Sequence, residues 1–270
     1  MSHLKNLLIL FFAAVVCVNA TFAGDIEDAD AALDKGDYAT ALKKYKTAAK
    51  KDAYAQLQVG SIYYEGLGVK QDYAEAVRWY KLAAAQGFAS AQLNLGVMFY
   101  EGKGVVQDYA EAVRWYKLAA VQGNVSAQLN LAIIFTQAQG VVQNYAEAVR
   151  WYKFAAAQGN SDAQYSLGIM FYEGKGVAQD YAEAFRWYKL AALQGNSTAQ
   201  FNLGALYVNG QGVVQDYVRA HMWFNIAALN GDKLSVSNRD IIANKMTSQQ
   251  IADAQKLARE CQERNFKKCD

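Results

Sequence analysis

The chain has 270 residues, 27 of them basic and 25 acidic, so its formal net charge is only +2. This near balance argues against a nucleic-acid or acidic-membrane partner, because both favour a basic excess on one face. Proline is absent, and no stretch alternates apolar and polar residues as a half-buried strand does. These features favour an all-α fold.

The first 23 residues have the layout of a cleavable export signal. Lys5 supplies a basic start, an apolar run follows from Leu7 to Val18, and small residues precede the expected cleavage after Ala23 or, as second choice, Ala20. A membrane anchor is the alternative, but the run is shorter than the roughly 20 residues that cross a bilayer. A lipid anchor on Cys17 is a second alternative. We expect a soluble, periplasmic or secreted mature chain with no membrane span.

A repeat of 36 residues dominates the rest of the sequence. The unit that begins at Asp72 reads DYAEAVRWYKLAAAQGFASAQLNLGVMFYEGKGVVQ, and three near-copies follow it. A degenerate copy that begins at Asp37 precedes it. All five tryptophans keep the same step: Trp79, Trp115, Trp151, Trp187 and Trp223. We expect the tryptophans to pack between repeats, and this regularity predicts a repeat architecture.

Each unit contains two predicted helices. Asp72 is a plausible N-cap of the first helix, and Gly87 follows that helix as a left-handed residue. The second helix is expected to begin near Ser90, whose oxygen could cap it, and to run to about Tyr100. Neither helix can bury its apolar stripe alone, so adjacent units must stack. The prediction is a right-handed α-solenoid of stacked antiparallel helix pairs.

The two ends of the array differ from its middle. Residues 24–51 are expected to form an N-terminal helix pair, residues 52–232 five repeats, and residues 233–270 a capping helix and tail. The capping helix should run from about Ser248 to Glu263, with Thr247 as its N-cap. One internal copy has Ala138 where the others have glycine, so we expect a distorted loop or a bend there.

Two cysteines remain after removal of the signal, Cys261 and Cys269. Oxidising conditions outside the cytoplasm would favour a disulfide between them. On one unbroken helix they would be about 12 Å apart along its axis, too far for a bridge. A bridge therefore requires the last helix to end near Arg264 or Asn265, and two free thiols are the alternative.

The run AQLNLGVMFYEGKGVVQDYAEAVRWYKLAAAQG resembles the Sel1-like repeat, a relative of the tetratricopeptide repeat. The resemblance covers about Lys51 to Asp232, and residues 24–51 resemble a weaker tetratricopeptide-like pair. It implies an adaptor scaffold for protein or peptide partners in cell-envelope or host-interaction processes. One exported branch, with a cysteine pair in each repeat, implies the alternative: a β-lactam- or peptidoglycan-fragment-binding protein with weak β-lactamase-like activity.

The residues themselves give little sign of catalysis. The mature chain has one histidine, His221, and has neither a Ser-x-x-Lys nor a Gly-x-Ser-x-Gly motif for an activated serine. No ligand set suits a metal, and no cofactor is expected. Asp72, Glu75 and Arg78 recur in several units, which indicates helix capping and surface ion pairs. We therefore expect no enzyme, apart from the weak hydrolase alternative.

The second helices supply the candidate partner-binding surface. In the tetratricopeptide relatives the equivalent helix lines a concave groove, and amides and tyrosines there suit a peptide. The alternative is that these side chains only stack between units. The oligomeric state is open, with a monomer favoured. The ten candidate residues are Gln58, Asn94, Asn130, Ser166, Asn202, Tyr64, Tyr100, Tyr172, Tyr165 and Phe201.

Overall fold

The computed structural model describes residues 24–229, 232–267 and 269, so the expected export signal lies outside the described residues. The described chain is helical and contains no strand. It divides into two units at Ala127 and Gln128, near the start of α7. None of its helices is long and apolar enough to span a bilayer. The all-α solenoid prediction is confirmed.

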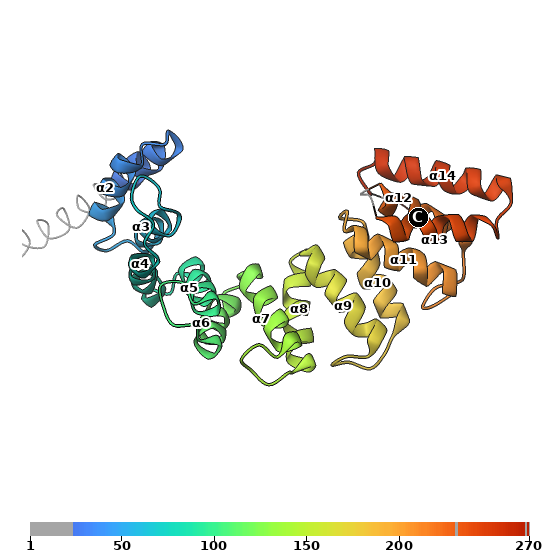
Figure 1. The fold of residues 1–270 in the computed structure, drawn as a ribbon, viewed down its shortest axis with the longest axis horizontal. Coiled ribbons are helices and arrows are strands. Elements are labelled where there is room, and N and C mark those ends of the chain that lie inside the picture. The colour runs from blue at the N-terminus through green and yellow to red at the C-terminus, as the bar shows by residue number, and fades with distance from the viewer. Residues whose placement is uncertain (1–23, 230–231, 268, 270) are drawn as a thin grey trace, which may run out of the picture. The chain divides into compact units, whose positions relative to one another are not determined.

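The first unit holds a helix over residues 24–34 and then α2 to α6 (Figure 1). The bounds are α2 Tyr38–Ala48, α3 Ala53–Glu65, α4 Tyr73–Ala85, α5 Ala89–Glu101 and α6 Tyr109–Val121. Successive helices pack against each other, α2 on α3, α3 on α4, α4 on α5 and α5 on α6. Small buried residues such as Ala76 and Ala84 permit this close approach.

The second unit holds most of α7 and all of α8 to α14. The bounds are α7 Val125–Gln137, α8 Tyr145–Ala157, α9 Ser161–Glu173, α10 Tyr181–Ala192, α11 Ser197–Asn209, α12 Tyr217–Ala228, α13 Lys233–Ala243 and α14 Ser248–Glu263. We call α4, α6, α8, α10 and α12 the A helices, and α3, α5, α7, α9 and α11 the B helices. The two kinds alternate along the chain.

Side-chain caps start the A helices where the repeat predicts them. The Asp72 carboxylate accepts a hydrogen bond from the Glu75 backbone N–H at 2.9 Å. The Glu75 carboxylate in turn pairs with Arg78 at 2.7 Å, and the same i,i+3 pair recurs in α6, α8 and α10. The expectation of caps and surface ion pairs is confirmed, and such exposed pairs contribute little stability.

The expected cap of α5 is wrong. The helix begins at Ala89, and its N-cap residue Phe88 makes no side-chain cap, so Ser90 lies inside the first turn. In the later B helices the equivalent residue is asparagine. Asn160 and Asn196 each accept from the backbone N–H three residues on, at 2.8 and 2.9 Å. Phe88 instead packs against the apolar cluster of its own repeat.

A close contact between helices is made where a glycine in a B helix meets an aromatic ring of the next A helix. A Cβ on Gly168 would lie 2.4 Å from Cδ1 of Tyr188, and one on Gly96 would lie 2.4 Å from Cδ1 of Tyr116. Both separations are far below van der Waals contact. At these positions the ring therefore lies directly on the helix backbone, whereas α7 has Ala132 at the equivalent position.

A ladder of glutamines joins the same helices on their buried side. Gln92 is 4% exposed, and its amide donates to the Ala84 carbonyl at 3.3 Å. Its oxygen accepts from Gln122 at 2.8 Å. The same pairing occurs between Gln164 and Gln194 at 2.7 Å. These bonds satisfy buried amides that would otherwise destabilise the core.

The tryptophans pack between successive helix pairs, as predicted. In the first unit Trp79 lies against the cluster around Tyr45, which belongs to the preceding pair. Trp115 likewise lies against the cluster around Tyr80. In the last repeat Trp223 is fully buried. Hydrophobic burial between neighbours is therefore the main term that stacks the repeats.

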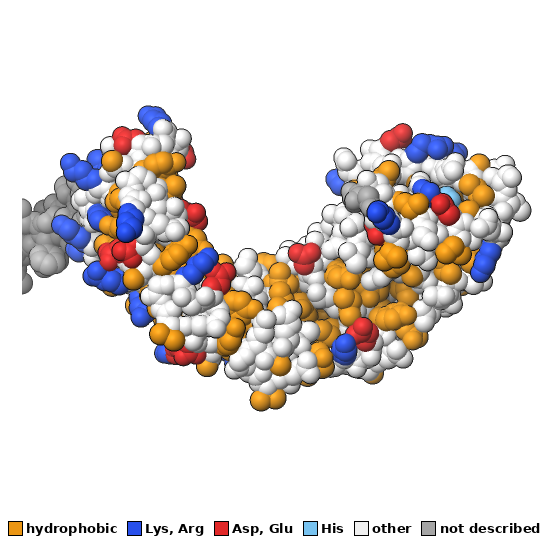
Figure 2. Space-filling model, viewed as in Figure 1, with side chains coloured by type: hydrophobic (Ala, Val, Ile, Leu, Met, Phe, Trp, Pro, Cys, Tyr) orange, Lys and Arg blue, Asp and Glu red, His pale blue; other side chains and the backbone are white. Residues whose placement is uncertain are grey.

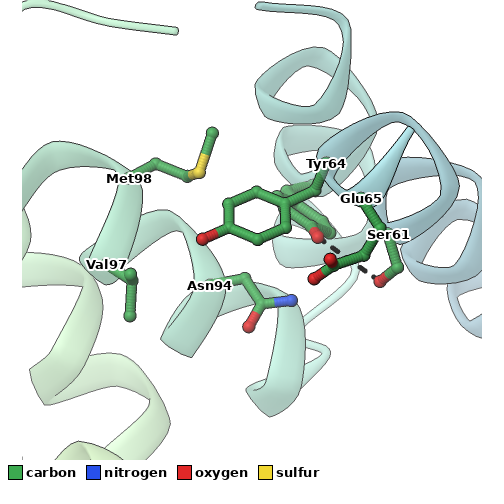
Figure 3. A pocket seen from close by; sticks show the side chains of 7 residues that line it. Ser61, Tyr64, Glu65, Asn94, Val97 and Met98 are labelled. Carbon is green, nitrogen blue, oxygen red and sulfur yellow. Dashed lines mark hydrogen bonds between the residues drawn. The ribbon is translucent and has the colours of Figure 1, made fainter. Parts of the chain in front are cut away.

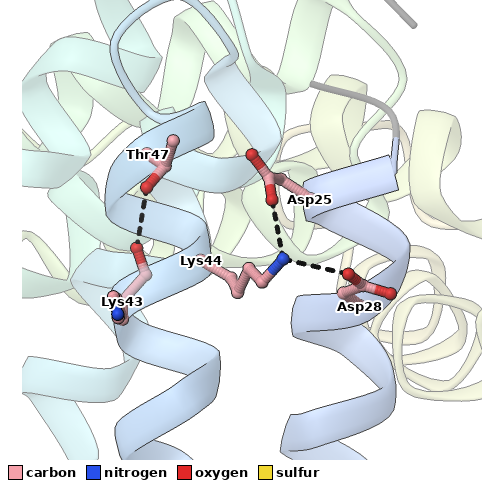
Figure 4. A network of polar contacts seen from close by, with 5 residues as sticks. All are labelled: Asp25, Asp28, Lys43, Lys44 and Thr47. Carbon is pink, nitrogen blue, oxygen red and sulfur yellow. Dashed lines mark hydrogen bonds and ion pairs between the residues drawn. The ribbon is translucent and has the colours of Figure 1, made fainter. Parts of the chain in front are cut away.

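The N-terminal end replaces this tryptophan with an ionic contact. Lys44 of α2, at the tryptophan position, places its ammonium 2.9 Å from Asp25 and 3.0 Å from Asp28 (Figure 4). Both aspartates belong to the helix over residues 24–34. The Tyr45 hydroxyl donates to Asp30 on the same helix. Charged and polar contacts thus cover the end that has no preceding repeat.

Two helices close the C-terminal end, one more than the sequence indicated. α13 follows the fifth repeat and packs against α12, as does α14. α14 has the predicted bounds, and Thr247 forms a capping box with Gln250. The helix ends between the two cysteines, and the structure joins Cys261 to Cys269 in a disulfide.

The expectation of a distorted loop at Ala138 is wrong. Ala138 takes a φ of 56°, close to the 64° to 73° of Gly66, Gly102, Gly174 and Gly210. The loop keeps the hydrogen bond seen in the other repeats. The Gln143 amide donates to the Thr136 carbonyl at 2.9 Å, just as the Gln107 amide donates to the Tyr100 carbonyl at 2.8 Å. The strain is therefore borne by alanine in a left-handed conformation, which costs roughly 1–2 kcal/mol.

We predict that Gly168→Ala destabilises the protein by up to about 2 kcal/mol. Overpacking against the Tyr188 ring costs about 1–3 kcal/mol, and the higher helix propensity of alanine offsets about 1 kcal/mol. Urea unfolding followed by circular dichroism measures the change. Ser166→Ala, in the same helix, is the control and should change the free energy of unfolding by less than about 0.5 kcal/mol. Equal stabilities for the two variants would contradict the contact.

His221 makes stability depend on pH. It is 3% exposed in α12, and its Nδ1 has no hydrogen-bond partner among the described residues. Burial lowers its pKa below the ordinary value of 6.5, Arg239 lowers it further, and Asp240 opposes them. Above that value the ring is neutral in both states. As the pH falls below it, the unfolded state binds a proton first, so the free energy of unfolding decreases.

We therefore predict that the native protein loses stability between pH 6.5 and 5.5 by up to about 1.4 kcal/mol per pH unit. His221→Phe should remove this slope, whatever its effect at pH 7.5. Phenylalanine is a fitting substitute because Phe185 holds the equivalent position one repeat earlier. Urea unfolding midpoints at pH 7.5, 6.5 and 5.5 measure the change in stability. An unchanged slope in the variant would show that other groups cause the loss of stability.

Candidate functional site

The ten candidate residues all lie on B helices, and every one is half-buried. Within each unit, we call this partly exposed side of the B helices the B-helix face. Some of its residues contribute to two small pockets, one in each unit. The others are engaged in contacts within their own repeat or lie apart from the pockets.

The first pocket lies between α3, α4 and α5 and has a volume of about 200 Å³. Tyr64 and Glu65 come from α3, Tyr80 from α4 and Asn94 from α5. Figure 3 shows the polar ends of Ser61, Glu65 and Asn94 gathered on one side of the Tyr64 ring. Ser61 lies 3.3 Å from the Tyr80 hydroxyl. This pocket presents a carboxylate, an amide and phenols to solvent.

The second pocket lies between α9, α10 and α11 and has a volume of about 290 Å³. Tyr172 and Glu173 come from α9, Tyr188 from α10 and Asn202 from α11. Tyr165 of α9 adds a third phenol, with its ring centroid 5.9 Å from that of Tyr188. Figure 2 shows apolar side chains gathered on the visible face of this unit.

The two pockets use the same positions of the repeat. Tyr64, Glu65, Tyr80 and Asn94 correspond to Tyr172, Glu173, Tyr188 and Asn202, each pair 108 residues apart. The intervening register inside the second unit has Thr136, Gln137 and Ser166 at three of these positions. A complete set of polar side chains therefore accompanies each pocket. The same four residue types also recur 36 residues after the first set, as Tyr100, Glu101, Tyr116 and Asn130.

Burial keeps the phenols at the floor of both pockets protonated. It raises the pKa of Tyr80 above its ordinary value, and hydrogen bonds with Ser61 and Asn94 oppose the rise. Burial also raises the pKa of Tyr188, with a contribution from nearby negative groups that include Glu173, while Asn202 opposes it. Both phenols therefore stay neutral near pH 7, able to donate or accept hydrogen bonds.

Other candidate residues are not pocket residues. Gln58 donates to the Tyr54 hydroxyl at 2.7 Å, and Ser166 donates to the Asp162 carbonyl at 2.8 Å. The Phe201 ring lies 5.5 Å from that of Phe224. The last two candidates, Tyr100 in the first unit and Asn130 in the second, line neither pocket.

Sequence reasoning missed several pocket residues, among them two tyrosines and two glutamates. Tyr80 and Tyr188 follow the helical period of the A-helix core stripe, so the pattern assigns them to packing alone. Glu65 and Glu173 follow the rim tyrosines directly, and their recurrence one position after Tyr64 and Tyr172 was an available signal. The tyrosines have two roles, because the ring packs on glycine while the hydroxyl reaches the pocket.

The geometry suits binding of a side chain better than chemistry. Both volumes are below the roughly 300–1,000 Å³ typical of small-molecule sites. Within the described residues, no three histidine, cysteine or acidic side chains are placed to hold a metal ion. His221 is buried in α12 and lines neither pocket.

Comparison with known proteins agrees with the repeat reading. The Sel1 repeat family model matches residues 53–88, 89–124, 125–160, 161–196 and 197–232. Each matched segment contains one B helix followed by one A helix. No protein with a curated description matches the chain significantly.

Two solved structures illustrate the likeness. A Sel1 repeat protein from Oxalobacter formigenes is 33% identical with a TM-score of 0.74, covering 78% of this chain and 88% of that chain. The protective antigen c5321 of uropathogenic Escherichia coli, which displays an SLR fold, is 29% identical with a TM-score of 0.44, covering 91% and 70%. Proteins built on this repeat are typically non-enzymatic scaffolds, and the fold generally mediates protein interaction. The chain belongs to the Sel1 repeat family.

Proposed function

We propose that this protein is an exported scaffold that binds a protein or peptide partner through its B-helix face, in a cell-envelope or host-interaction process. The observation that carries the proposal is the recurrence of one Tyr-Glu-Tyr-Asn set around two pockets in the same register. Stacking alone requires the ring of each tyrosine, but it does not require a carboxylate and an amide at the pocket.

The chemistry of these side chains suits a polypeptide. Asn94 and Asn202 carry both donors and acceptors and can pair with a peptide backbone. Half-exposed Tyr64 and Tyr172 offer large, rigid contact area at low conformational-entropy cost. Pockets of this size each accommodate one side chain of an extended partner, and we propose that the scaffold binds as a monomer.

The disulfide supports export. Bonds such as Cys261–Cys269 persist in oxidising compartments and are rare in the cytosol. The basic and apolar start of the sequence, which ends at Ala23, is the second support. We therefore place the mature protein in the periplasm or outside the cell.

Export predicts a mature chain that begins at Gly24, or at Thr21 if cleavage follows Ala20. The full-length gene should be expressed in its bacterial host and the protein purified from the periplasmic and medium fractions. Intact mass under non-reducing conditions should show the cleaved N-terminus and the loss of two hydrogens in the disulfide. Cytoplasmic protein with an intact Met1 and two free thiols would contradict export.

The face itself is tested by Asn94→Ala, Asn130→Ala and Asn202→Ala combined. Since all three are half-buried, we expect less than about 1 kcal/mol change in the free energy of unfolding per site and at least tenfold less partner captured from envelope extract. Leu82→Ala with Phe154→Ala is the matched control, because both residues are exposed on A helices at 50% and 46%. Equal capture by the native and triple variant proteins would refute the proposed binding face.

A further inference from the structure

We propose that the pocket between α9, α10 and α11 holds the cationic end of a lysine or arginine side chain from the partner. This inference rests on the proposed function and names the chemistry of one contact within it. The shape of the pocket, its charge, and a comparison with the equivalent pocket of the first unit support it.

The shape is that of a small aromatic cage. Tyr165, Tyr172 and Tyr188 line one space of about 290 Å³. The rings of Tyr165 and Tyr172 are half-buried, whereas Tyr188 is 3% exposed and contributes its hydroxyl. A cation within about 6 Å of a ring centroid is attracted by the negative face of the ring, and several rings around one site add their contributions. Lysine and arginine also have apolar stems, which the neighbouring Ile169 and Leu206 can contact.

The lining of the pocket includes one carboxylate. Glu173 lines the pocket, and no lysine or arginine is among its described lining residues. The carboxylate raises the pKa of both Tyr165 and Tyr188 by its charge, so its field extends across the cage. Lys175 pairs with one oxygen of Glu173 at 2.7 Å, but it is well exposed and lies over the Tyr145 ring. A second cation on Glu173 would therefore be favoured, and an anion disfavoured.

The first unit already places a cation at the equivalent tyrosine. Lys103 donates to the Tyr64 hydroxyl at 3.1 Å, and its ammonium lies 5.3 Å from the centre of that ring. The residue equivalent to Lys103 in the second pocket is Gln211, whose oxygen lies 3.5 Å from the Tyr172 hydroxyl. The same tyrosine position thus has an internal cation in one unit and a neutral amide in the other. The second pocket has Lys175 on Glu173 but a neutral amide at the Tyr172 hydroxyl, where a partner can supply a cation.

The experiment uses the full mature protein with ¹³C-labelled tyrosine rings. The probes are two heptapeptides of glycine and alanine that differ only at the centre, arginine in one and citrulline, its neutral isostere, in the other. Ring signals of Tyr172 and Tyr188, assigned with Tyr→Phe variants, report binding. We expect the arginine peptide to bind at least about fivefold more tightly than the citrulline peptide, as a partly exposed charge and cation–π contact allow.

Two variants locate the effect. Glu173→Gln should weaken arginine-peptide binding about fivefold or more. Gln211→Lys, which copies Lys103, should weaken it by filling the cage from within. Glu183→Gln is the control, since this exposed carboxylate of α10 pairs with Arg186 and lines neither pocket. Unfolding in urea establishes that all three variants fold, and Lys103 shows that the repeat accepts lysine at this position.

Equal binding of the arginine and citrulline peptides, no binding of either, or equal effects of Glu173→Gln and Glu183→Gln would each overturn the cation proposal. The proposed function fails separately, when the triple asparagine variant captures its partner as well as the native protein does. If the citrulline peptide bound as tightly as the arginine peptide, while partner capture still depended on the asparagines, the cation proposal would be refuted and the proposed scaffold function would stand.

Discussion

The contact on which this structure depends is an aromatic ring laid on a helix backbone. Gly60, Gly96, Gly168 and Gly204 each leave a place that a Cβ would fill, and the ring of the next A helix occupies it. The missing side chain lets the ring of the neighbouring helix lie against the backbone at these four positions. Packing density in protein interiors is high, so the ring fills the space that the missing carbon leaves, whereas the third repeat has Ala132 at the equivalent position.

The same contact also makes the pockets. Because the Tyr80 and Tyr188 rings lie flat against glycine, their hydroxyls emerge at the bottom of the space between two B helices. In the last repeat Phe224 makes the glycine contact without a hydroxyl. Stacking there is retained while the polar floor is lost. In these tyrosines the ring therefore stabilises the stacking of the helices, and the hydroxyl contributes to the proposed binding pocket.

Much of the fold follows from the sequence because its determinants are local and repeated. The cap at Asp72, the end of α14 before Cys269 and the packing of the tryptophans each depend on residue type and spacing alone. The sequence failed where tertiary contact decides. Phe88 starts a helix without capping it, because its side chain has no hydrogen-bond acceptor and packs, partly buried, against an apolar cluster. α13 has no repeat to mark it.

The candidate site was only half predictable for a related reason. Periodicity places Asn94, Asn202, Tyr64 and Tyr172 on one side of the B helices, but it cannot show that a core tyrosine from the A helix completes the site. The left-handed Ala138 is a similar case, because the geometry of the loop is set by its neighbours. The sequence pattern indicates that glycine is preferred at this position, but it cannot show that alanine adopts the same left-handed conformation there.

Comparison of the five copies within one chain separates packing from recognition. The buried glutamines and all five tryptophans are unchanged from copy to copy, as the stacking contact demands. Other positions differ in the core as well as at the surface. One equivalent core position holds Ile62, Met98, Ile134, Met170 or Leu206, and the loop residue, which is at least partly exposed, is Leu67, Lys103, Gln139, Lys175 or Gln211 in successive copies. Each of these loop residues is compatible with stacking, but the charge of the loop residue differs from copy to copy. The copies therefore share one means of stacking while each can present a different contact to the partner.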